Sequence, residues 1–161
     1  AGLAAGLLVD LIFLKRLLKK LDSIPAWIGV AVHVFYALGC FGFFMGVPVP
    51  ITALALPAGY LVGMRLARSG APQNRLHTVS RATALFTTVV LAAACCASGF
   101  LARSDPYTGA NLEGMLRLNF KVTGAMITAL ILIGGAALLA INWLITRWVL
   151  HRVYKYQSSR G

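Results

Sequence analysis

His33 is the first residue of this chain whose type and position could support chemistry. It lies in the apolar run "VAVHVFYALGC", and its imidazole can gain or lose a proton near neutral pH. An ionisable group inside an apolar span is a functional candidate by default. His33 could act as a haem axial ligand, a proton relay or a substrate contact. The alternative is a structural histidine, hydrogen-bonded to Tyr36, Thr128, Asn142 or a backbone carbonyl.

A haem at His33 would need a second axial ligand at the same depth, commonly another histidine. The two other histidines, His77 and His151, lie beside arginines at the edges of apolar segments. The sequence therefore offers no second histidine at the depth of His33. A haem- or metal-binding redox subunit remains an alternative, and the cofactor is unknown.

Asn142 and Tyr36 are the other polar residues with a candidate binding role. A single amide inside a helix bundle usually forms a hydrogen bond to another helix, so packing is the expected role of Asn142 and substrate contact the alternative. If the chain were a small carrier or channel, His33, Tyr36 and Asn142 would line its path.

Three cysteines form the third candidate. Cys95 and Cys96 are adjacent in "LAAACCASGF", and Cys40 is expected at nearly the same depth of a neighbouring helix. Three thiols at one level could bind a soft metal or form a disulfide. However, adjacent residues of a helix point about 100° apart, there is no C-x-x-C motif, and no charge lies near to activate a thiol. We expect these cysteines to be small packing residues and predict no metal site.

Catalytic constellations are not apparent. The chain has no H-E-x-x-H motif, no glycine-rich phosphate loop and no Ser/His/Asp set expected at one depth. Only four residues are acidic, which leaves few groups for acid–base chemistry. An enzyme is therefore the less favoured expectation.

The elements that position these residues follow from the gaps between charges. The chain is 59% hydrophobic and 12% charged, about half the charged share of a soluble domain. Gaps of 42, 21 and 25 residues separate Asp22 from Arg65, Arg81 from Arg103, and Lys121 from Arg147. Since a spanning helix needs about 20 apolar residues, the first gap holds two helices. The predicted helices are 24–46, 50–67, 80–102 and 122–150, with a turn near Pro48 and Pro50.

The N-terminal segment 1–21 is apolar as far as Leu14 except for Asp10. Its leucines recur at helical spacing, with Lys15, Arg16, Lys19 and Lys20 elsewhere on the wheel. The pattern favours an amphipathic helix lying in the membrane interface. Part of a fifth spanning helix is the alternative, which Asp10 disfavours because a lone carboxylate is costly at mid-membrane.

Lysine and arginine predict the orientation. One side carries 12 of the 15 basic residues, which the positive-inside rule places in the cytoplasm with both termini. The net charge of +11 lies at helix ends, so anionic headgroups explain it and nucleic acid is not expected. Candidate headgroup or phosphate contacts are Lys15, Arg16, Lys19, Lys20, Arg65, Arg68, Arg75 and Arg81.

Together these patterns predict an all-α, polytopic integral membrane protein of the plasma (inner) membrane. Residues 1–161 would form a single transmembrane domain, a four-helix bundle with an N-terminal amphipathic helix. The expected function is non-catalytic: a subunit or partner of a larger membrane assembly, with a transport-related assembly as one candidate. The chain would act with a protein partner or as a homo-oligomer.

Overall fold

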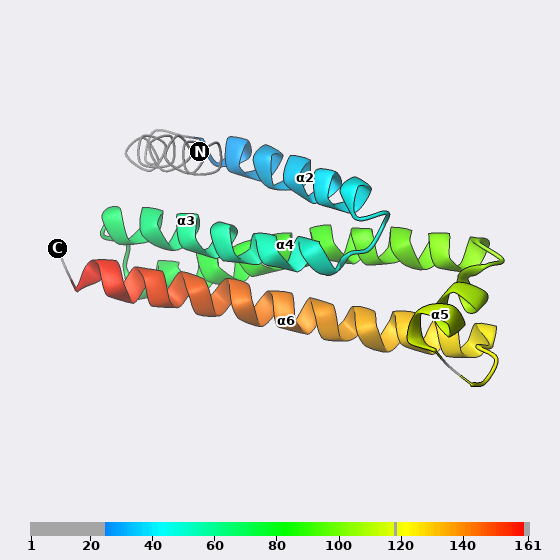
Figure 1. Cartoon of the computed structure of the whole chain (residues 1–161). Helices are drawn as coiled ribbons and strands as arrows, with labels where there is room; N and C mark the ends of the chain where they lie inside the picture. Colours follow the sequence, from blue (N-terminus) through cyan, green and yellow to red (C-terminus); the bar gives the residue numbers. More distant parts are fainter. Residues whose placement is uncertain (1–24, 118, 160–161) are drawn as a thin grey trace, which may run out of the picture. The chain divides into compact units, whose positions relative to one another are not determined.

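The computed structural model describes residues 25–117 and 119–159, and this part of the chain contains helices and no strand. Four segments are long and apolar enough to cross a membrane (Figure 1). They are α2 (Ala26–Phe43), the 3-10 helix η2 (Val49–Leu54) continued by α3 (Ala55–Arg68), α4 (Gln73–Ser104) and α6 (Gly124–Ser158). A short helix, α5 (Thr108–Leu116), connects the last two. The all-α class and the four apolar helices are confirmed.

The chain divides into two compact units, Ala1–Val32 and His33–Gly161. In the first unit the structure describes the beginning of α2, from Ala26 onward. The predicted interfacial helix 1–21, with Lys15, Arg16, Lys19 and Lys20, lies outside the described residues. The helix packing considered below belongs to the second unit.

The turn predicted near Pro48 and Pro50 is present between α2 and α3. Gly46 adopts a left-handed backbone with φ of 83°, a conformation that glycine accepts without a steric penalty. Pro48 then precedes η2, which has a proline in its first turn. A proline is tolerated there because the first amides of a helix need no intrahelical acceptor.

The predicted start of the third helix at residue 80 is wrong, because α4 begins at Gln73. Pro72 precedes it in an extended conformation, so Thr78 and Ser80 lie within the helix and not at its N-terminus. Thr78 instead donates a hydrogen bond to the carbonyl oxygen of Asn74, one turn back. The prediction was based on apolar residues, which mark only the part of a helix that avoids water. The backbone hydrogen bonds of the helix continue through the polar turns on either side, so the helix is longer than its apolar part.

The same reason explains the C-terminus of α6. The prediction ended this helix at residue 150, whereas the structure continues it to Ser158. The added turns contain Arg152, Lys155 and Gln157, which are good helix formers although they are polar.

Residues 69–72 connect α3 to α4 by a Schellman turn. The amide of Gly70 bonds to the carbonyl of Ala67, and that of Ala71 to the carbonyl of Leu66. Gly70 supplies the left-handed conformation, with φ of 59°, that this ending requires. Leu66 and Ala71 are buried in one cluster with Leu76 and Leu150, which fixes the start of α4 beside the C-terminal half of α6.

Two carboxylates organise the connection between α4 and α6. Asp105 accepts hydrogen bonds from the amide of Tyr107 at 3.0 Å and the hydroxyl of Thr108 at 3.2 Å. Glu113 accepts from the amide of Val122 at 2.6 Å. These bonds hold α5. A short helix here agrees with the apolar residues Leu112, Met115 and Leu116, whose spacing of three and four residues is that of one helix face.

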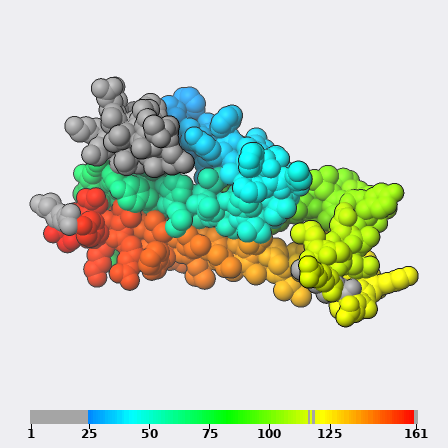
Figure 2. All heavy atoms as spheres, in the orientation of Figure 1, coloured from blue at the N-terminus to red at the C-terminus, as the bar shows by residue number. Residues whose placement is uncertain are grey.

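Two glycines of α3 bring it into close contact with α6. A Cβ atom at Gly59 would lie 2.8 Å from the carbonyl oxygen of Thr146, and one at Gly63 would lie 2.7 Å from that of Leu150. Such distances require a residue without a side chain. The two helices therefore run parallel with their backbones in contact, and α3 also lies against the C-terminal half of α6 in the space-filling view (Figure 2).

Glycines recur four residues apart, Gly42 with Gly46 and Gly59 with Gly63, a spacing that predicts close contact between the first two predicted helices. The structure shows that this prediction is wrong. A Cβ atom at Gly42 of α2 would meet nothing within 4 Å. The pair that forms the close contact, Gly59 and Gly63, faces a helix more than eighty residues further along the chain. The spacing identified a contact surface but carried no information about its partner.

Candidate functional site

A row of buried polar side chains lies between the antiparallel helices α4 and α6. Its members are Thr87 on α4 and Asn142 and Thr146 on α6, each at most 2% exposed. The amide nitrogen of Asn142 donates to the hydroxyls of Thr87 and Thr88, both at 3.2 Å. The hydroxyls of Thr87 and Thr146 lie 3.1 Å apart. We call these residues, with Ser80 and His151 one to two turns away, the polar seam.

The seam also bonds to the backbones of its own helices. Thr146 donates to the carbonyl of Asn142 at 2.8 Å, and Thr87 bonds to the carbonyl of Ala84 at 3.1 Å. Because a hydroxyl has one proton, Thr87 accepts from Asn142 and donates either to the carbonyl of Ala84 or to the hydroxyl of Thr146. A buried hydrogen-bond network of this kind favours one relative rotation of the two helices.

Ser80 and His151 continue the seam toward the C-terminal end of α6. The Oγ of Ser80 lies 3.4 Å from Nδ1 of His151, and this nitrogen lies 2.8 Å from the carbonyl oxygen of Arg147. A carbonyl oxygen only accepts, so Nδ1 carries the proton. It has no lone pair to take a proton from Ser80, and the pair is not arranged as a nucleophile with its general base.

The described carboxylates do not complete this pair either. Asp105 and Glu113, the acidic residues of the described part of the chain, lie near α5 and are engaged in its hydrogen bonds. His77 lies beside His151, with ring centroids 5.6 Å apart. The role that this geometry supports for the seam is structural: its hydrogen bonds hold α4 and α6 in register.

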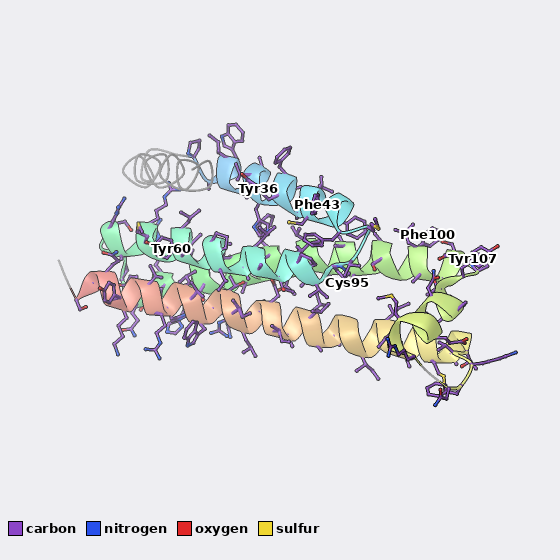
Figure 3. All side chains as sticks on the ribbon, viewed as in Figure 1. Tyr36, Phe43, Tyr60, Cys95, Phe100 and Tyr107 are labelled. Carbon is purple, nitrogen blue, oxygen red and sulfur yellow. The ribbon has the colours of Figure 1, made fainter. Side chains whose placement is uncertain are left out.

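The three predicted binding residues occupy different surroundings. Asn142 is buried in the seam, at 1% exposure, whereas Tyr36 on α2 is 57% exposed (Figure 3). His33 packs its ring against Phe86, with centroids 5.4 Å apart. Within the described residues no hydrogen bond joins His33 or Tyr36 to Asn142. Asn142 has the interhelical packing role that its sequence context favoured.

The cysteines share a level of the fold, as their positions predicted. Cys40 of α2 and Cys95 of α4 both pack against the buried cluster of Ala37, Ile51 and Leu91. All three thiols are free, and Cys96 is exposed. In the described segments no group of three histidine, cysteine or acidic residues is placed to hold a metal ion.

A variant with alanine at both Cys95 and Cys96 is expected to keep the fold and the stability of the wild type. Small-to-smaller changes at partly exposed sites remove little packing, so the free energy of unfolding should change by less than about 1 kcal/mol. Unfolding in mixed detergent micelles, followed by circular dichroism, provides the measurement. A loss of helix or a much larger destabilisation would show that the thiols have a specific role.

The basic residues divide between the two ends of α4 and α6. Tyr154 donates to the carbonyl of Ala71 at 2.6 Å, which places the start of α4 beside the last turns of α6. This end carries Arg65, Arg68, Arg75, Arg81, Arg147, Arg152 and Lys155. Arg103, Arg117 and Lys121 lie at the other end, around α5. The separation of charge that the sequence indicated is thus present along the folded helices.

Sequence reasoning found Asn142 but missed its partners. Ser80, Ala84, Thr87 and Leu91 are all buried on α4, and their spacing of three and four residues marks one helix face. Asn142 and Thr146 repeat this spacing on α6. Polar residues that recur on one face within an apolar helix were the available signal.

No protein-family model matches this chain, and comparisons with curated proteins and with solved structures find no match either. The fold and the seam define a class: a helical protein with a polar seam between two of its long helices and many large apolar side chains on its surface.

Proposed function

We propose that this chain is an integral membrane protein without catalytic activity that works as a subunit or partner of a larger membrane assembly. The observation that carries the proposal is the set of large apolar side chains on its surface, together with the polar side chains buried between α4 and α6. The buried set includes Ser80, Thr87, Asn142 and Thr146, whereas Phe35, Phe43, Leu132 and Ile133 are all more than 60% exposed. Water would strongly oppose this arrangement, and lipid or apolar protein surfaces would favour it.

The orientation is part of the proposal. The basic end of α3, α4 and α6 would face the cytoplasm, together with the C-terminus, and α5 would lie on the opposite surface. The arginines at the cytoplasmic end would contact anionic headgroups, which favour juxtamembrane cations. We propose a plasma (inner) membrane as the location.

A partner role is supported by what the polar groups do. The seam bonds internally, and its described members are turned toward one another rather than toward a cavity. The chemistry offered outward is an apolar helix surface. Such a surface suits contacts with lipid and with other membrane helices, where close packing provides the stability.

A photo-crosslinking experiment in the native membrane tests the partner role. A photoreactive phenylalanine analogue would replace, one at a time, four exposed residues on three helices: Phe35 and Phe43 on α2, Val89 on α4 and Leu144 on α6. We expect a discrete crosslinked protein band from one helix and none from the others, because a specific partner covers one face.

The mass of the gently extracted protein provides the complementary measurement. We expect a complex larger than one chain, of fixed stoichiometry. A monomer in mild detergent, combined with the absence of a discrete crosslink from all four positions, would contradict a stable assembly.

A further inference from the structure

A hollow of about 740 Å³ opens on the surface between α4 and α6, on the α5 side of the polar seam. Its walls include small residues, among them Cys96 and Gly99 of α4 and Gly135 and Ala136 of α6. Cys95 and Phe100, labelled in Figure 3, also line it from α4. This volume lies within the range of about 300–1,000 Å³ that small-molecule sites occupy. We call it the outer groove.

The outer groove is polar at one end only. Arg103, Ser104 and Thr128 lie at the end near α5, while Ala92 and Leu139 form the opposite end. Beyond Ala92 the two helices close together, since Leu91 is fully buried and Asn142 is 1% exposed. An occupant must therefore have a long apolar part and a polar group at the α5 end.

Arg103 gives that end a fixed positive charge. Its Nη1 donates to the hydroxyl of Thr128 at 2.7 Å, and this hydroxyl donates to the carbonyl of Gly124 at 2.9 Å. Within the described residues Arg103 has no carboxylate partner, because Asp105 and Glu113 bond to the connection around α5. The complementary group is an anion, and guanidinium forms its strongest hydrogen bonds with carboxylates and phosphates.

The length of the groove distinguishes a lipid from a membrane helix. From Ala92 to Ser104 a helix advances about 18 Å at 1.5 Å per residue. One leaflet contributes about half of the roughly 30 Å hydrocarbon thickness. The groove is thus as deep as a single leaflet, with its charge at headgroup level, whereas a spanning helix would need a contact face about twice as long.

From this geometry we propose that the outer groove binds one anionic phospholipid, with an acyl chain between α4 and α6 and the phosphate at Arg103. Nothing lies within 4 Å of a Cβ position at Gly135, which leaves room for the chain beside the α6 backbone, and Thr128 holds the guanidinium at the mouth. The proposal depends on membrane insertion but not on a protein partner.

Two adjacent glycines provide a matched pair of variants. A Cβ atom at Gly135, which lines the groove, would meet nothing within 4 Å, and the same is true at Gly134, which does not line it. Gly135→Leu should therefore fill the groove without disturbing the fold. Gly134→Leu makes the same chemical change on the same helix outside the groove.

The experiment measures lipid retention by native mass spectrometry of the full chain in detergent. The probes are dioleoyl-phosphatidylglycerol and dioleoyl-phosphatidylcholine. We expect the wild type and Gly134→Leu to retain one phosphatidylglycerol. Gly135→Leu should bind it about tenfold more weakly, which corresponds to lost contact with about two methylenes at roughly 0.8 kcal/mol each.

Arg103→Gln tests the charge separately and lies at an exposed position. The wild type should prefer phosphatidylglycerol over phosphatidylcholine about fivefold, the factor for one interfacial cation worth about 1 kcal/mol. Arg103→Gln should abolish this preference and leave phosphatidylcholine binding unchanged.

Equal lipid retention by Gly135→Leu and Gly134→Leu would overturn the proposal, as would an unchanged headgroup preference in Arg103→Gln. A change of oligomeric state in Gly135→Leu without loss of lipid would overturn it in favour of a protein occupant. Resistance of the chain to extraction from membranes by alkaline carbonate checks insertion independently. The carbonate extraction therefore distinguishes a chain that lacks the lipid site from a chain that is not inserted in a membrane. The crosslinking experiment tests the protein partner separately.

Discussion

Replacing Gly63 with alanine is expected to lower the free energy of unfolding by about 2 kcal/mol, within the range of about 1–3 kcal/mol for overpacked cores. The new methyl group would lie 2.7 Å from the carbonyl oxygen of Leu150 and 3.2 Å from Cβ of Val153. The first of these atoms belongs to the α6 backbone, so no rotamer change relieves the clash. Helix α6 must move away from α3.

Gly59→Ala is expected to have a similar effect, because its methyl group would meet the carbonyl oxygen of Thr146 at 2.8 Å. The two changes should not add, since the displacement of α6 caused by one relieves part of the clash at the other. Neighbouring sites that share a backbone shift commonly show coupling of about 0.5–3 kcal/mol. The double variant should therefore be less destabilised than the sum of the single variants.

Gly134→Ala is the matched control. It introduces the same methyl group into a helix where nothing lies within 4 Å of the new atom. Alanine is a better helix former than glycine by about 1 kcal/mol, so this variant should be as stable as the wild type or more so. Unfolding in mixed micelles, followed by circular dichroism, compares the three. Equal stabilities of Gly63→Ala and Gly134→Ala would show that α3 and α6 are not in backbone contact.

The number and approximate positions of the four long apolar helices could be predicted because they depend on local composition. Each uncharged run is long enough for a helix, and a helix satisfies its backbone hydrogen bonds without a partner segment. Proline and glycine located the turn before α3 for the same local reason. The helix ends could not be predicted as well, because the polar turns at Gln73 and after Leu150 carry no apolar signal.

The contacts between helices could not be predicted because they depend on which faces meet. The spacing of Gly59 and Gly63 is equally compatible with packing against α2 or against α6. For Asn142 the sequence indicated a hydrogen bond to another helix, but it did not indicate that the acceptors would be threonines of α4. The missing information was the rotation of each helix about its own axis. The seam and the glycine contact together determine this rotation for α6.

The glycine contact and the polar seam act on the same stretch of α6. The carbonyl of Thr146 faces Gly59 of α3, while its hydroxyl faces Thr87 of α4. Helix α6 is thus fixed on two sides at one level, once by close packing and once by hydrogen bonds. A change in the seam should therefore be felt at the α3 contact as well.

Asn142→Ala is expected to lower the free energy of unfolding by about 2 kcal/mol. The change removes hydrogen bonds to Thr87 and Thr88, and interhelical bonds in membrane proteins contribute about 0.6 kcal/mol each on average. It also leaves a small cavity at a position that is 1% exposed, which adds a packing loss. Asn74→Ala, at an exposed position in the first turn of α4, should change stability by less than about 0.5 kcal/mol.

A double-mutant cycle with Thr87→Val separates the hydrogen bond from the cavity. Valine keeps the shape of threonine, so this variant removes the hydroxyl that accepts from Asn142 and lies beside Thr146. We expect the single change to destabilise by about 1 kcal/mol and the coupling with Asn142→Ala to be about 0.5–1 kcal/mol. Strict additivity would mean that the two side chains do not interact, in which case α4 and α6 would be held together by apolar packing alone.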